Sequence, residues 1–221
     1  MGSLPYSLEE IPYVLMALAM AFSVHEFAHA YVAYKFGDPT AKDQGRLTLS
    51  PLAHLDIFGT ILIFIAGFGW ARPVPVNRHY FQNPRLAGIL VSFAGPFSNL
   101  LLAALGVAVW YSMISFGIVY MIPNWFASGF EQFFQIFIGL NVVLFVFNLL
   151  PFPPLDGYRI IEDLAPTGIR VKMSQLENYG ILIFLVLVLT PLDKYTIQPI
   201  FNVVIPSVFQ MLDSIFSHLL L

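Results

Sequence analysis

Residues 25–29 carry the side-chain types and the spacing of a metal-dependent hydrolase. The five letters HEFAH place His25 and His29 four positions apart, with Glu26 directly after the first histidine. In a helix this spacing puts both imidazoles on one face, where they can bind one metal ion. Glu26 is then placed to accept a proton from the attacking water rather than to bind the metal. Zinc is the ion we expect, because imidazole suits it and it supports hydrolysis without redox chemistry.

The motif lies in a segment with the length and apolar character of a membrane span. Of the 221 residues, 58% are hydrophobic and 10% are charged, and the mean hydropathy is +0.77. A soluble domain is about one quarter charged, so this composition indicates an integral membrane protein. Ionisable residues are costly in a bilayer. Three of them within one apolar pentapeptide therefore favour a metal site over an isolated packed polar side chain.

The apolar segments around the motif predict an all-α integral membrane protein. We expect about five to six transmembrane helices, from the rough requirement of about 20 apolar residues for each crossing. A shorter stretch at 57–70 predicts a re-entrant or half-span segment, with minor β-like strands in the loops at 45–51 and 72–76. Residues 1–221 are expected to form one domain, with core motifs at 21–160 and C-terminal spans at 176–221. The expected spans are Ile11–Tyr34, Leu86–Tyr111, Phe130–Leu150, Leu176–Thr190 and Ile197–Leu220.

Basic residues predict how these spans are oriented. Lys and Arg gather after the first span, after the short stretch and after the third long span, and such loops are typically cytoplasmic. If residues 57–70 dip into the bilayer and return, all three basic groups lie on one side. We therefore expect a multi-pass protein of the cell membrane with an external N-terminus. His25 lies ten residues before Lys35, about 15 Å deeper along a helix, which puts the metal in the cytoplasmic half of the bilayer.

A hydrolytic zinc site needs a third protein ligand and one open position. The chain has no cysteine, so this ligand must be His, Asp or Glu. Asp156 follows three prolines that end the preceding helix, and Gly157 permits a close approach or a tight turn. Alone, Asp156 is equally consistent with a helix cap or a surface turn. Together with HEFAH in a chain that lacks cysteine, we interpret it as the third ligand.

Three separate stretches together resemble the site-2 proteases, which are zinc-dependent intramembrane metalloproteases. They are HEFAH, FAGPFSNL at 93–100 and NLLPFPPLDG at 148–157, and RLTLSPLAHLDIFGT with GWARPVPVN is similar to the compact prokaryotic branch. The resemblance covers about residues 21–160. Within FAGPFSNL we interpret Asn99 as a polar contact between spans rather than part of the site. Gly95 and Pro96 are expected to permit close helix packing or a kink.

The resemblance implies one zinc ion per chain, held by His25, His29 and Asp156, with Glu26 as the general base. It also implies that Asn148 positions water or stabilises the oxyanion. The expected function is that of an endopeptidase that cleaves membrane proteins in or near their transmembrane segments.

A divalent-cation or proton transporter is the alternative, because buried polar residues also mark ion pathways. The expected partners are a membrane-protein substrate and the lipid bilayer. The net charge of −3 argues against nucleic acid. The substrate's identity and the oligomeric state leave no mark in the sequence.

Overall fold

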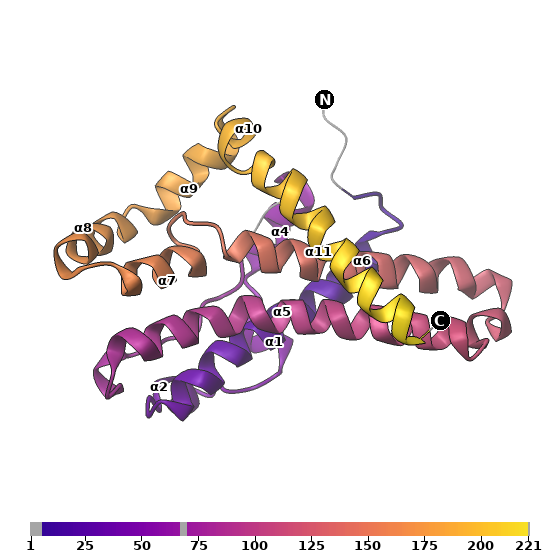
Figure 1. Cartoon of the computed structure of the whole chain (residues 1–221), viewed down its shortest axis with the longest axis horizontal. Coiled ribbons are helices and arrows are strands. Elements are labelled where there is room, and N and C mark those ends of the chain that lie inside the picture. Colours follow the sequence, from indigo (N-terminus) through magenta and orange to yellow (C-terminus); the bar gives the residue numbers. More distant parts are fainter. Residues whose placement is uncertain (1–5, 67–69, 221) are drawn as a thin grey trace.

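The computed structural model describes residues 6–66 and 70–220 of the chain (Figure 1). Within these ranges all regular structure is helical. Two short 3₁₀ turns, at Arg78–Tyr80 and Ile118–Met121, accompany the α-helices. The α-helices are α1 Ile11–Lys35, α2 Thr40–Asp43, α3 Pro51–His54, α4 Ile57–Ala66, α5 Pro84–Ser115, α6 Asn124–Asn148, α7 Asp156–Leu164, α8 Thr167–Glu177, α9 Gly180–Leu189, α10 Asp193–Thr196 and α11 Gln198–Leu220.

Four of the described helices, α1, α5, α6 and α11, are long and apolar enough to cross a membrane. The prediction of a helical protein with several membrane spans is thus confirmed. The fourth predicted span, Leu176–Thr190, is wrong as one continuous helix. Helices α8 and α9 meet there at a bend of 71°, so the described residues offer four candidate spans, or five if the bent pair is one. Helix α9 alone has 10 residues, about 15 Å, half the thickness of the hydrocarbon core.

Helices α1, α5 and α6 pack against one another and form the frame of the site. Figure 1 shows α5, the longest, lying alongside α6 and α1. Small residues let these backbones approach closely, as is usual between membrane helices; Ala21, Ala30, Ala33, Ala87 and Ala103 are buried. Helix α11 crosses the pair α5 and α6 and packs on it through Val208 and Leu212. Helices α7 and α8 lie beyond the end of α6, at one end of the molecule (Figure 1).

The predicted β-like strands at 45–51 and 72–76 do not form, since no strand occurs among the described residues. Segment 72–76 is extended, but its backbone pairs with two side chains and with the carbonyl of His54 rather than with a neighbouring strand. Arg46 donates to the carbonyl of Arg72, and Glu26 accepts from the amide of Val74. The two prolines at 73 and 75 also have no N–H to give to a strand ladder. Of the predicted half-span at 57–70, residues 57–66 form α4, and residues 67–69 lie outside the described ranges.

Candidate metal centre

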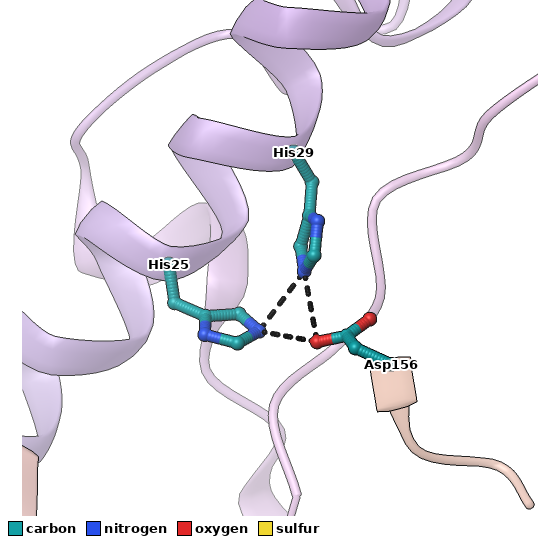
Figure 2. Close-up of side chains that lie close together, drawn as sticks. All are labelled: His25, His29 and Asp156. Atoms are coloured by element: carbon teal, nitrogen blue, oxygen red, sulfur yellow. Dashed lines mark hydrogen bonds and ion pairs between the residues drawn. The ribbon is translucent and has the colours of Figure 1, made fainter. Parts of the chain in front are cut away.

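Helix α1 brings two imidazoles to one point inside the bundle. His25 and His29 lie one turn apart on the face of α1 that is turned toward α5, and both are buried. Their Nε2 atoms are 3.0 Å apart. Asp156 Oδ2 lies 3.3 Å from each of these nitrogen atoms. Figure 2 shows the three side chains pointing at one another from the two elements that carry them.

Asp156 reaches this point because the chain breaks after α6. Helix α6 ends at Asn148, and residues 149–155 turn back before α7 begins at Asp156. Gly157 lies directly on the end of α6, where a Cβ atom would be 2.2 Å from the carbonyl oxygen of Leu149. The predicted close approach at Gly157 is therefore confirmed. Asp156 is the first residue of α7, but Leu155 is the N-cap residue and no side chain caps the helix, so the carboxylate is buried and turned toward the histidines instead.

Hydrogen bonds on the far side of each imidazole determine which nitrogen carries the proton. His29 Nδ1 lies 2.7 Å from the carbonyl oxygen of Val91, which can only accept, so Nδ1 is the protonated atom. His25 Nδ1 lies 2.7 Å from Asn99 Oδ1. The Asn99 amide donates to Asn141 Oδ1, and the Asn141 amide donates to the carbonyl of Phe137. That backbone carbonyl sets the orientation of both amides, and it makes Asn99 Oδ1 an acceptor from His25.

With Nδ1 as the donor, each imidazole in its neutral form presents the lone pair of Nε2 to the other imidazole and to the Asp156 carboxylate. Three acceptors that converge without a donor are unfavourable in a buried site unless a cation lies between them. A tetrahedral zinc with bonds of about 2.0–2.1 Å separates its ligand atoms by about 3.3–3.4 Å. The observed separations of 3.0–3.3 Å fit that geometry. The donor set is thus consistent with a zinc site.

Helix α5 supplies space for the two imidazoles as well as their outer partners. A Cβ atom on Gly95 would lie 2.2 Å from His29 Nε2 and 2.7 Å from His25 Cε1. Any larger residue at this position would therefore displace the imidazoles. The close packing predicted at Gly95 is confirmed, with the added finding that the packed group is the histidine pair.

Glu26 and Asn148 border the same cavity as the three convergent side chains. The cavity has a volume of about 520 Å³ and lies between α1, α5, the end of α6, segment 70–76, α7 and α8. Glu26 is buried, and its Oε2 accepts a hydrogen bond of 2.8 Å from the amide of Val74. Asn148 Nδ2 donates to the carbonyl of Leu144 at 3.0 Å. The amide of Asn148 has a second N–H, so this contact leaves it a donor for another group.

Ion pairs fasten α7, and with it Asp156, at the other end of the cavity. Asp163 is almost fully buried, and its Oδ1 lies 2.5 Å from Arg78 Nη1 and 3.1 Å from Arg170 Nη2. Arg159 pairs with Glu177 of α8 at 2.8 Å. Burial favours a lower pKa for Arg159, but the carboxylates around it, Glu177 first, together raise that pKa. These contacts join α7 to α8 and to the loop before α5.

Sequence reasoning missed the outer partners of the site. The polar contact between spans predicted for Asn99 is present, but the sequence did not show that its partner on α1 is His25. The amide of Val74 was missed as a partner of Glu26. The signal for Asn99 was its place in the FAGPFSNL stretch, one turn after Gly95. No side chain signals the Val74 amide, because the interaction uses backbone.

Comparisons with known proteins agree with this site. Residues 112–191, which include Asp156, match peptidase family M50. The chain is 57% identical over 215 residues to "Putative zinc metalloprotease YwhC" of Bacillus subtilis, and the alignment covers 97% of each chain. "Putative zinc metalloprotease Rip2" is 30% identical in Mycolicibacterium smegmatis and 31% identical in Mycobacterium tuberculosis H37Rv, in each case over 80% of this chain and 67% of the relative. No solved structure matches the chain.

The high identity to YwhC over nearly the full length of both chains extends the match beyond residues 112–191 to the HEFAH helix. It also favours a hydrolase over the transporter alternative. The chain belongs to peptidase family M50, the zinc metalloproteases of the site-2 protease type.

Proposed function

We propose that this protein is an intramembrane endopeptidase that hydrolyses peptide bonds in or near the transmembrane segments of other membrane proteins. The observation that carries the proposal is the convergence of His25, His29 and Asp156 inside a bundle of membrane-crossing helices. Glu26 borders the same cavity. In this proposal one zinc ion per chain is held by those three side chains, and residues 1–221 act as a single protease domain.

The chain's own residues divide the chemistry among them. Bound zinc would supply Lewis acidity toward water and the scissile carbonyl. Glu26 accepts the proton of the attacking water and passes it to the leaving amine. The hydrogen bond from Val74 fixes one oxygen of Glu26 and leaves the other facing the cavity. Asn148 donates its second N–H to the oxyanion, a role supported by its place in the cavity wall.

The substrate must be a chain that can reach this cavity from the membrane. A helical substrate keeps its carbonyls in its own hydrogen bonds, so it has to unwind locally before attack. We place the cavity in the cytoplasmic half of the cell membrane. The basic residues Lys35 and Lys42, which follow the HEFAH helix, support that orientation by the positive-inside rule.

The test uses purified protein in liposomes with a single-pass membrane substrate. Glu26→Gln should retain zinc, as measured by metal analysis, and lose cleavage. Asp156→Ala should lose zinc as well as cleavage. Glu131→Gln is the matched control, because Glu131 is exposed and its one side-chain hydrogen bond among the described residues is to Gln135 of its own helix. Normal turnover by Glu26→Gln would remove Glu26 from the chemistry. Zinc flux across the liposome membrane without cleavage would overturn the proposal in favour of a transporter.

A further inference from the structure

Glu26 depends for its position on a segment that has little structure of its own. Its Oε2 accepts from the amide of Val74, in the extended stretch 72–76. Pro73 and Pro75 flank Val74 and have no N–H groups, so this stretch cannot form a regular ladder. Val74 itself is buried against Ala30 and Ala41. Whatever holds this stretch in place therefore also fixes the carboxylate of Glu26.

Arg46 holds the stretch from behind. Its Nη2 donates to the carbonyl oxygens of Arg72 at 2.7 Å and Pro73 at 3.4 Å. The chain delivers Arg46 to this place by a turn at Gly45, whose φ of +68° suits glycine, and by a 2.7 Å bond from the Arg46 amide to the carbonyl of Ala41. Arg46 is only 9% exposed. A basic residue that counted from the sequence as a cytoplasmic loop charge is thus a buried one.

The electrostatics of Arg46 also connect it to the site. Burial lowers the pKa of its guanidinium, the nearby Arg72 adds to this effect, and the charge of Glu26 opposes it. At the other end of the stretch, the carboxylate of Asp38 accepts from the amide of Asn77 at 2.6 Å. The stretch is therefore fixed at both ends by residues that follow the HEFAH helix.

We infer that Arg46 is a positioning residue for hydrolysis: its guanidinium clamps two carbonyls so that the Val74 amide holds Glu26 toward the cavity. The inference rests on the proposed function, since it assigns Glu26 the role of base. Arg46 contacts neither the three convergent side chains nor the cavity, so its effect passes through the backbone of residues 72–74.

Kinetics of Arg46→Gln give the first test. The variant should keep the zinc content of the wild type, while kcat falls by about tenfold to a hundredfold with little change in KM, as expected when the base is misplaced. Lys172→Gln is the matched control, because Lys172 is exposed, does not line the cavity and makes no hydrogen bond or ion pair among the described residues. It should leave kcat unchanged. Arg46→Lys keeps the charge but is shorter and lacks the rigid planar donors of guanidinium, so it should recover only part of kcat.

A second measurement is independent of proteolysis. The chain has no cysteine, so Val76→Cys introduces a single thiol at the cavity wall. Its modification by N-ethylmaleimide should be roughly tenfold faster when Arg46→Gln is added. Loss of one hydrogen bond from a charged group, about 1.4 kcal/mol, makes opening of the stretch about tenfold more favourable. Adding Lys172→Gln should not change the rate.

Unchanged labelling in Arg46→Gln, or full kcat in Arg46→Lys, would overturn the clamp. If Arg46→Gln fails to fold, the labelling rate and kcat of Arg46→Lys decide the question. If the wild-type chain binds zinc but cleaves nothing, the proposed function and the catalytic part of this inference are refuted. The labelling comparison would still decide whether Arg46 holds the stretch.

Discussion

Replacing Asn99 by alanine should weaken zinc binding although Asn99 is not among the proposed ligands. Asn99 is fully buried in α5, and its Oδ1 lies 2.7 Å from His25 Nδ1. The same side chain donates to Asn141 Oδ1 at 3.0 Å. Asn99→Ala therefore leaves two buried groups without partners, the N–H of His25 and the Oδ1 of Asn141. The imidazole of His25 also loses the contact that fixes its tautomer and ring orientation.

The size of the effect follows from these contacts. Loss of the outer partner of a metal-binding histidine typically lowers metal affinity by about 10–100-fold, which corresponds to about 1.4–2.7 kcal/mol. The unpaired Asn141 Oδ1 affects the apo and the metal-bound protein alike, so it lowers folding stability more than zinc affinity. Asn99→Asp should keep most of the affinity, because a carboxylate still accepts from the protonated Nδ1.

Competition with a chromophoric zinc chelator in detergent measures this affinity. Ser98→Ala is the matched control. Ser98 is the buried neighbour of Asn99, and its hydroxyl donates to the Gly95 carbonyl of its own helix. It should bind zinc as the wild type does. Wild-type affinity in a folded Asn99→Ala variant would refute the assignment of the His25 tautomer. So would a larger loss in Asn99→Asp than in Asn99→Ala.

Three further changes test other parts of the site. Gly95→Ala should abolish stoichiometric zinc in metal analysis, whereas Gly139→Ala, with open space around its Cβ, should retain it. Asp163→Ala should lower the free energy of unfolding by roughly 3 kcal/mol in denaturant titrations, because the two arginines that pair with the buried Asp163 carboxylate lose their partner. Burial, and then the charge of Glu177, raises the pKa of Glu162. The folded protein therefore binds the carboxyl proton of Glu162 more tightly than the unfolded chain does. Its stability falls as the pH rises past about 4.3, the ordinary pKa of glutamate. Glu162→Gln should raise Tm at pH 7 but not at pH 3.5.

The side chains that α1 and α7 contribute to the site could be predicted from their spacing and from the residues next to them in the sequence. A spacing of four residues determines that His25 and His29 share a helix face whatever surrounds them. Asp156 was identified by a different argument, from the prolines before it and the absence of cysteine. Both arguments use local geometry or elimination, and neither requires knowledge of which helices pack together.

The outer partners could not be predicted in this way, because they depend on how helices approach one another. Asn99 and Asn141 are both polar residues in apolar spans. Nothing in their spacing shows that Asn99 binds His25 or that Asn141 binds the amide of Asn99. Arg46 has the composition of a loop charge, and only the return of segment 72–76 makes it a buried clamp. The bend at α8 and α9 was missed for a similar reason. Gly180 lies against Pro153 and Pro154, and this contact is invisible to a hydropathy window.

Helix α5 shows how a membrane helix can shape the proposed metal centre without giving it a ligand. Gly95 leaves room for both imidazoles. The carbonyl oxygen of Val91 accepts a hydrogen bond from His29 Nδ1, and Asn99 Oδ1 accepts one from His25 Nδ1. Pro96 has no N–H for the carbonyl of Ser92, which loosens the helix in this turn. In the hydrocarbon region no water could take over these roles, so every one of them must come from protein. The FAGPFSNL stretch is therefore as much a part of the centre as HEFAH. A change at Gly95 or Asn99 should weaken zinc binding, as a change at His25 or His29 would.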